Sequence, residues 1–278
     1  QRRPFVFVPV YFGYERIVEG GTYVSELYGK AKKKESVWDI FRTLRKIQGS
    51  FGKVHVNFGE PIALTQLLDQ RQPDWRTLQY NDDATPEWVP GFVEHLGEKI
   101  ITHINNAAVV NPVSLLSLTL LSTPKHAMDE KELEVQLDFY LMLLRGVPYS
   151  GSVIVPNIQG KDVIAYCERL QIVFRQKHPF GDILMLNEEK AVTLTYFRNN
   201  NIHLFALPSL IACLIVNNRR LLKTELIALC KQVFPFMKSE LFIHWDVNEL
   251  DNIINRYLSL MVNANILVQR DEEIWAPE

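Results

Sequence analysis

The stretch that decides the fold is Pro4–Tyr14, which reads PFVFVPVYFGY. Aromatic or β-branched residues run through it with almost no polar break: Phe5, Val6, Phe7, Val8, Val10, Tyr11 and Phe12. This composition favours a strand buried on both faces, as in a parallel or mixed α/β sheet. Only three residues precede the run, and the first is Gln1. We therefore expect the chain to be the back part of a longer protein, cut inside a domain.

Several segments carry a family resemblance that extends over the whole chain. They are FVPVYFGYERIVEGGTY (7–23), the basic segment Lys30–Ser36, KVHVNFGEPI (53–62), RGVPYS (145–150), TYFRNNNIHLFALPSLIA (195–212) and ELFIHWDVNEL (240–250). Together they resemble the bacterial glycerol-3-phosphate acyltransferases of the inner membrane. Family members have four acyltransferase blocks, and the fourth is a hydrophobic strand with a proline. Val6–Tyr11, with Pro9, matches that fourth block.

The resemblance implies a role for this strand and for one residue in it. The strand would complete the catalytic α/β sheet and form part of the wall beside the acyl donor, and Pro9 is the one residue carried over as substrate-binding. A proline in a strand removes a ladder hydrogen bond, so we expect a bulge or an edge facing the site at Pro9.

The family's catalytic block, a histidine followed after four residues by an aspartate, is missing from this chain. None of the seven histidines has an aspartate five positions later. In the family the carboxylate orients the imidazole, which acts as base on the glycerol hydroxyl. We therefore expect the first three blocks to lie upstream of Gln1, and this fragment to be inactive alone.

Two histidines come close to an acid–base spacing. His55 precedes Glu60 by five positions, but the alternation of Val54, Val56 and Phe58 favours an exposed strand histidine. His178 and Asp182 are one residue short of the family spacing, and the intervening Pro and Gly favour a turn.

For the intact enzyme, the resemblance implies transfer of a fatty acyl group from acyl-carrier protein or coenzyme A to glycerol 3-phosphate. The product would be lysophosphatidate, made for phospholipid synthesis by a peripheral protein at the cytoplasmic face of the inner membrane. No metal or tightly bound cofactor is implied. The alternative is a non-catalytic module that docks a membrane or a partner and regulates the enzyme, or a DNA-binding regulator.

Charge is distributed unevenly along the chain, although the net charge is only −2. Residues 1–60 carry 11 Lys and Arg against 6 Asp and Glu, a balance of +5, and the remainder carries 19 against 26, a balance of −7. The basic part suits anionic lipid or an acidic carrier protein, although Lys30–Lys34 also suits a solvated loop. The acidic remainder argues against nucleic acid. Cys167, Cys213 and Cys230 have no disulfide or zinc spacing, which suits a reducing cytoplasm.

We expect three regions: the end of the catalytic domain over 1–64, a helical scaffold over 65–150 and a C-terminal α+β region over 151–278. The first contains a helix over Val37–Gln48. In the second, 65–90 is a surface connection, and a helix starting at Thr85 is short or kinked at Pro90. Three further helices follow at Phe92–Ala108, Val113–Leu121 and after Asp129, with apolar residues at helical spacing.

The last region is expected to combine a small antiparallel meander with a winged-helix-like end. The meander comprises 172–175, 183–186 and 191–197. The apolar run Leu204–Val216 is short of a membrane span and predicts a buried helix, with a membrane-lying helix as the alternative. Helices capped at Thr224 and Asp246, with a break at Pro235, precede a terminal hairpin. We interpret this end as a packing or partner-binding unit, because the helix before the hairpin offers only Arg256 to a phosphate.

Overall fold

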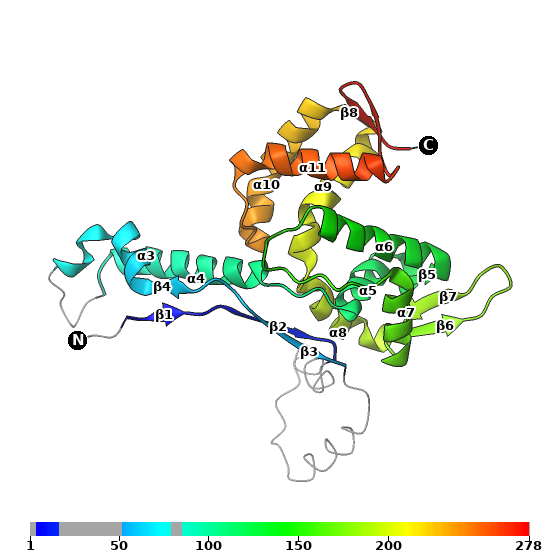
Figure 1. The fold of residues 1–278 in the computed structure, drawn as a ribbon, viewed down its shortest axis with the longest axis horizontal. Helices are drawn as coiled ribbons and strands as arrows, with labels where there is room; N and C mark the ends of the chain where they lie inside the picture. The colour runs from blue at the N-terminus through cyan, green and yellow to red at the C-terminus, as the bar shows by residue number, and fades with distance from the viewer. Residues whose placement is uncertain (1–3, 17–51, 79–84, 278) are drawn as a thin grey trace, which may run out of the picture.

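The computed structural model describes residues 4–16, 52–78 and 85–277. The chain combines many helices with four small sheets, all of whose strand pairs are antiparallel within this described part. A long arm carries the N-terminal strands, and two groups of helices lie at its other end (Figure 1). The predicted helix Val37–Gln48 and the basic segment Lys30–Ser36 lie outside the described residues.

The N-terminal stretch forms a narrow ribbon with the segment that begins at residue 52. β1 (Val6–Phe7) pairs with β4 (Ile62–Ala63), and β2 (Val10–Tyr14) pairs with β3 (Val54–Phe58), both antiparallel. The prediction of a strand buried on both faces was wrong for these residues, because the ribbon has helices on one face only and its other face is exposed. Pro9 lies between β1 and β2, where the ladder is interrupted, as expected for a proline.

The helical scaffold follows the ribbon. It contains α3 (Leu64–Arg71), the 3₁₀ turn η1 (Pro73–Arg76), α4 (Trp88–Asn106), α5 (Pro112–Leu121) and α6 (Glu130–Gly146). The interpretation of 65–90 as connection alone was wrong, since α3 and η1 occupy much of it. The two helices expected from Thr85 and from Phe92 are one continuous helix, α4, which starts at Trp88, because a proline in the first turn removes no hydrogen bond that the helix would make.

α5 is the buried centre of this scaffold. It starts with a capping box between Asn111 and Ser114, and most of its residues are buried, as its apolar residues on nearly all sides predict. α6 begins at its predicted cap, where the Asp129 carboxylate accepts the backbone N–H of Lys131. The predicted positions of both helices are confirmed.

The predicted meander is half correct. β6 (Val173–Gln176) and β7 (Ile183–Leu186) pair as expected, but 191–197 belongs to α8 (Glu188–Asn199), and the third strand is β5 (Ala127–Asp129), giving the order β5-β7-β6. Buried Leu194 and Phe197 lie three residues apart, which suits a helix. The prediction failed because a short run with several β-branched and aromatic residues is compatible with either a strand or a helix. The short helix α7 (Gly160–Arg169) packs against α5 and α6.

The C-terminal part runs helix, strand, helix, helix, hairpin. Its elements are α9 (Ile202–Asn218), β8 (Arg220–Leu222), α10 (Lys223–Leu241), η3 (Val247–Glu249), α11 (Leu250–Asn263), β9 (Val268–Arg270) and β10 (Glu273–Trp275). The terminal hairpin is as predicted, and the predicted capping box of Asp246 with Glu249 forms, although it caps η3 rather than α11. Two details were wrong: α10 starts before Thr224 and continues through Pro235. Strand β8, which sequence analysis missed, pairs with β10 and gives the order β8-β10-β9.

One hydrophobic core links the scaffold and the C-terminal part. α9 contributes Leu204, Leu207, Ile211 and Ile215 to it, in agreement with the prediction of a buried helix. Within the described ranges, no single helix has the length and apolar composition of a membrane span. One bent pair, residues 191–199 with 202–218 at 86°, meets those two criteria when its halves are combined.

Candidate functional site

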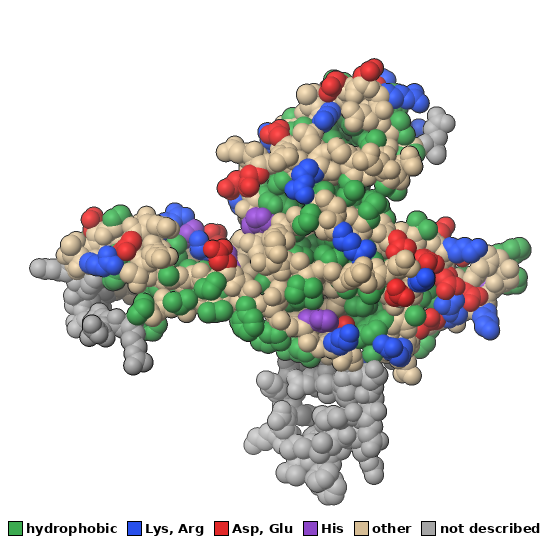
Figure 2. Space-filling model, viewed as in Figure 1, with side chains coloured by type: hydrophobic (Ala, Val, Ile, Leu, Met, Phe, Trp, Pro, Cys, Tyr) green, Lys and Arg blue, Asp and Glu red, His purple; other side chains and the backbone are tan. Residues whose placement is uncertain are grey.

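The β2–β3 ribbon has a polar face toward the helices and an apolar face toward solvent. Tyr11 and Glu15 are buried, and His55 and Asn57 are half-buried, on the helical side. The opposite face exposes large apolar side chains: Phe12, Tyr14, Val54, Val56 and Phe58. Figure 2 shows hydrophobic side chains along the lower side of this arm. The alternation in β3 predicted that its valines would face the core, and the structure reverses that assignment.

The inner face is held by hydrogen bonds from polar side chains. The Asn57 amide donates to the carbonyls of Ala107 and Ser152, each at 2.9 Å. The Tyr11 hydroxyl lies 3.3 Å from the Val109 carbonyl and 3.3 Å from Oδ1 of Asn201, at the corner between α8 and α9. Burial raises the pKa of Tyr11 to about 12, so the hydroxyl stays protonated and remains a donor. These polar contacts explain which face of the ribbon is inside.

Pro9, the predicted substrate-binding residue, is buried at the junction of β1 and β2. Its carbonyl accepts the backbone N–H of Gly59 at 2.8 Å. A Cβ on Gly59 would come within 2.5 Å of the His103 carbonyl oxygen on α4 and 3.2 Å of the Pro9 side chain. The close approach of three backbones, from the ribbon and from α4, therefore requires glycine at 59 and fixes the position of Pro9.

A buried carboxylate lies at the end of the ribbon beyond Tyr14. Glu15 is only 1% exposed. Its Oε2 accepts the backbone N–H of Lys53 at 2.6 Å and a short hydrogen bond from the Tyr166 hydroxyl on α7. Its Oε1 lies 3.1 Å from Nε2 of His55. We call Glu15, His55 and Tyr166 the ribbon clamp, since they join β2, β3 and α7.

The clamp has the hydrogen bonds that a buried carboxylate needs. A carboxylate that is removed from water is tolerated only when donors replace the lost hydration, and here three donors do so. Burial, followed by the hydrogen bond to the Glu15 carboxylate, raises the pKa of Tyr166 well above its ordinary value, so Tyr166 donates a proton to the bond without losing it. Burial also raises the pKa of the adjacent Cys167 thiol, which excludes a reactive thiolate there. The geometry is that of a structural tie.

The structure pairs neither the His55 imidazole with Glu60 nor the His178 imidazole with Asp182, the two candidate pairs that the sequence spacing offered. His55 pairs with Glu15 and is half-buried, so its interpretation as an exposed strand histidine was wrong. The Glu60 backbone carbonyl instead lies 2.7 Å from Nδ1 of His103. Asp182 bonds to Arg175 at 3.0 Å, and this hydrogen bond holds the pKa of Asp182 below its usual range.

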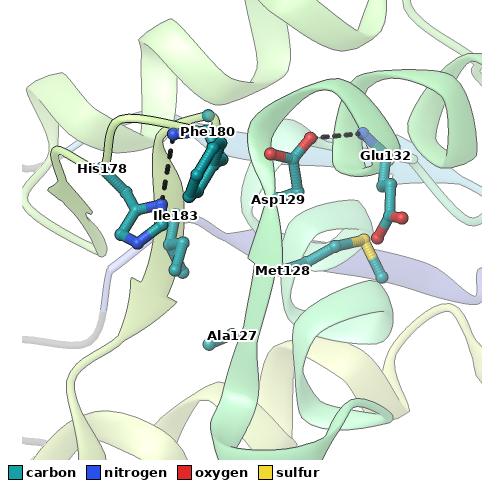
Figure 3. A pocket seen from close by; sticks show the side chains of 8 residues that line it. Ala127, Met128, Asp129, Glu132, His178, Phe180 and Ile183 are labelled. Atoms are coloured by element: carbon teal, nitrogen blue, oxygen red, sulfur yellow. Dashed lines mark hydrogen bonds between the residues drawn. The ribbon is translucent and has the colours of Figure 1, made fainter.

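His178 belongs to a turn, as the Pro and Gly that follow it predict. Its Nδ1 accepts the backbone N–H of Phe180 at 3.3 Å. A shallow pocket of about 440 Å³ lies beside this turn, between it and β5 (Figure 3). In the close-up, His178 and Asp129 lie on opposite sides of Phe180, and Asp129 is engaged by the first turn of α6. The pocket therefore has no histidine–carboxylate pair poised for proton transfer.

Sequence reasoning missed Glu15 and Tyr166. Glu15 directly follows an apolar strand and is 151 positions from Tyr166, so no local spacing links them. The one local signal in the sequence is a single acidic residue directly after an apolar strand, which indicates a polar contact there. Among the residues that the structure describes, no group of three or more His, Cys, Asp or Glu side chains is placed to hold a metal ion.

The chain thus consists of a helical scaffold that carries an amphipathic ribbon and ends in a helical part with a small sheet. Residues 23–278 match the family described as glycerol-3-phosphate acyltransferase C-terminal region. The chain is 43% identical over 277 residues to the glycerol-3-phosphate acyltransferase of Pseudomonas syringae pv. syringae, covering 100% of this chain and 33% of the relative. It is 44% identical over 276 residues to that of Pseudomonas aeruginosa, covering 99% and 33%.

A third relative, the glycerol-3-phosphate acyltransferase of Ectopseudomonas mendocina, is 43% identical over 266 residues, covering 96% of this chain and 32% of that protein. The chain therefore spans about a third of the length of the curated relatives it matches. It belongs to the glycerol-3-phosphate acyltransferase family and corresponds to the C-terminal region of its members.

Proposed function

We propose that this chain is the C-terminal part of a glycerol-3-phosphate 1-O-acyltransferase. The glycerol hydroxyl attacks the thioester carbonyl of acyl-carrier protein or acyl-coenzyme A; a C–O bond forms, the C–S bond breaks, and a base takes the hydroxyl proton. The product is lysophosphatidate. The observation that supports this proposal is the family match over residues 23–278.

The base and the phosphate-binding groups belong, in this proposal, to the part of the protein upstream of Gln1. No histidine of this chain has an aspartate five positions later, so the family's catalytic spacing does not occur in it. The fragment alone is then inactive. We also propose that the protein lies peripherally at the cytoplasmic face of the inner membrane. The chain is proposed to divide into three regions, 1–64, 65–150 and 151–278.

The ribbon is proposed to complete the catalytic sheet. The exposure of its apolar face supports this proposal: Phe12 is 51% exposed, Val56 48% and Phe58 64%. A row of such side chains on one sheet face is usually covered by another layer of structure. The upstream catalytic part would supply that layer, and Pro9 would then lie at the edge of the site.

The C-terminal elements are proposed to form a winged-helix-like module with a packing or partner-binding role. The order α9, β8, α10, α11, β9, β10, with β10 between β8 and β9, supports this proposal. α11 turns its apolar residues inward, and Arg256 is its one cationic side chain, which does not suit a DNA-reading helix.

The test is transfer of labelled glycerol 3-phosphate into lysophosphatidate by residues 1–278 and by the same chain extended upstream through the missing blocks. We expect activity in the extended chain alone. Activity of residues 1–278 alone would place the catalytic centre within these residues and would contradict the proposal that the catalytic groups lie upstream. No acyl transfer by either chain would favour the alternative of a non-catalytic docking module.

Replacement of Pro9 tests the role of that residue. In the extended enzyme, Pro9→Ala is expected to lower the rate of acyl transfer about tenfold or more, while unfolding stability falls by less than about 1 kcal/mol. The reason is that Pro9 shapes the ribbon beside the proposed site more than it fills the core. Ala63→Gly, in the neighbouring β4, is the control for general loosening of the ribbon. Parallel losses of rate and stability in both variants would contradict the proposal.

A further inference from the structure

A groove that none of the ribbon residues lines runs along one face of α9. Its volume is about 450 Å³, within the range of roughly 300–1,000 Å³ that is usual for small-molecule sites. α9 contributes Ile202, Phe205, Ala206 and Ser209, which follow the i, i+3, i+4, i+7 spacing of one helix face. α5, α6 and α10 supply the other walls.

The walls of the groove are mostly apolar. Met237 and Leu241 come from α10, and Tyr140 on α6 packs against Phe205 with ring centroids 5.0 Å apart and the rings tilted by 50°. The Tyr140 hydroxyl accepts a hydrogen bond from Gln136 at 2.9 Å, so its polar end has a partner. Methionine and leucine side chains are flexible and apolar, so they can pack around a flexible apolar ligand without needing a hydrogen bond from it.

One cation lies at the end of the groove where α8 meets α9. Arg198 is the single cationic side chain among the lining residues. Its Nε and Nη2 both bond to Oδ1 of Asn199, and no carboxylate among the described side chains forms an ion pair with it. The N-terminus of α9, with its partial positive charge, begins at the same corner, and Asn201 makes no side-chain cap there because its Oδ1 faces the Tyr11 hydroxyl.

We propose that this groove binds a long-chain carboxylate, with the acyl chain along α9 and the carboxylate at Arg198. A planar guanidinium matches a carboxylate with two parallel hydrogen bonds and compensates its single charge. A phosphomonoester carries nearly two charges at neutral pH and calls for more donors than the one cation that lines the groove. The proposal does not depend on the acyltransferase function.

The test is calorimetric titration of the purified protein with oleate, below its micelle concentration, and with methyl oleate. We expect one oleate site per chain and about tenfold weaker binding of the neutral ester. Arg198→Gln should weaken oleate about tenfold and leave methyl oleate unchanged, because only the acid uses the guanidinium. Arg219→Gln, which removes an exposed arginine at the other end of α9, should change neither.

A second variant tests the apolar wall. Ala206→Trp should fill the groove and reduce the binding of both ligands at least tenfold, and Ser209→Trp, at an exposed position of the same stripe, serves if the first variant does not fold. Oleate binding that Arg198→Gln leaves unchanged, or several equivalent weak sites, would overturn the proposal. Lysophosphatidate binding more tightly than oleate with the same dependence on Arg198 would overturn the choice of a carboxylate.

Discussion

At the scale of single residues, polar side chains in apolar surroundings hold this fold in register. Glu15 holds the end of the ribbon on α7, and Tyr11 holds its middle on the α8–α9 corner. Burying a polar group costs free energy unless the group is hydrogen-bonded. Each of these contacts therefore adds little net stability but strongly favours the one arrangement in which the hydrogen bond forms.

Removal of the Glu15 carboxylate should destabilise the protein. Glu15→Ala leaves the Tyr166 hydroxyl and the Lys53 N–H without their acceptor, and we expect a loss of about 3 kcal/mol in the free energy of unfolding. Tyr166→Phe, which removes one donor, should cost about 1–2 kcal/mol. Urea denaturation measures both, with exposed Glu60→Ala as the control. Equal values for Glu15→Ala and Glu60→Ala would show that the clamp contributes nothing.

His203 should make stability depend on pH. Burial lowers the pKa of His203 to about 4, from an ordinary value of 6.5, and its Nε2 lies 3.1 Å from the Asn105 carbonyl. The unfolded chain therefore binds a proton between about pH 6.5 and 4 that the folded protein does not bind. Stability is fully present above pH 6.5 and falls as the pH drops toward 4, by at most about 3 kcal/mol from this residue.

Denaturation series at pH 7, 6, 5 and 4 measure this effect. His203→Gln should reduce the loss between pH 7 and 4, because glutamine does not titrate, although it lowers stability at pH 7. His178→Gln, the same substitution at a turn histidine, is the control for the change of residue type itself. A slope that His203→Gln does not alter would assign the acid sensitivity to other groups.

At the scale of elements, the ribbon is the part that exposes a row of large apolar side chains. Val10 faces Phe58 and Phe12 faces Val56 across the ladder, so these apolar side chains form continuous rows on the outer face. Cross-strand pairs of this kind contribute roughly 0.2–1 kcal/mol each, which is little for a two-stranded ribbon on its own. The helical side provides the rest through Asn57, Tyr11 and Glu15.

Polar substitution on the outer face should distinguish the fragment from the extended protein. Phe12→Ser is expected to change the stability of residues 1–278 by less than about 1 kcal/mol, since the side chain is exposed there. In a chain extended upstream, where we propose that the face is covered, the same change should cost about 3 kcal/mol. Phe180→Ser, at a side chain 93% exposed on the β6–β7 turn, is the control. Equal small effects of Phe12→Ser in both chains would show that the face stays uncovered.

At the scale of the whole molecule, an aromatic cluster joins the scaffold to the C-terminal part. Tyr149 lies with ring centroids 5.1 Å from His203, 4.6 Å from His244 and 4.8 Å from Trp245. Its hydroxyl accepts the backbone N–H of His244 at 3.2 Å. Asn105 adds a 2.8 Å hydrogen bond to the Leu241 carbonyl. Because the core is also continuous across this junction, we expect the two parts to unfold together.

Tyr149→Ala should weaken that cooperation. Loss of a buried aromatic ring costs about 3–5 kcal/mol, and the cavity opens where the two parts meet. Hydrogen exchange is expected to accelerate in α10 and α11 more than in α5, because α5 keeps its contacts with α7 and α8. Val135→Ala, at an exposed residue of α6, should leave all three helices unchanged. Uniform acceleration in the three helices would mean that the whole protein still unfolds as one unit.

The sequence by itself determined much of the helical part. Apolar residues at helical spacing located α4, α5, α6 and α11, because this signal is local. The cap at Asp129 marked the start of α6, and the box of Asp246 with Glu249 marked the turn η3 that leads into α11. The family was also readable from segments spread over the chain. The turn at His178 followed from its proline and glycine.

Tertiary structure alone decided which face of the ribbon is inside and which strands pair. Period-two alternation defines two faces of a strand, but distant partners such as Ala107 and Tyr166 select the polar face for burial. The same holds for α8, which was expected as a strand and is a helix packed on α5, and for β5 and β8, which pair with strands more than 50 positions away. Local propensity is a weak free-energy term of a few tenths of a kcal/mol per residue, so long-range packing overrides it.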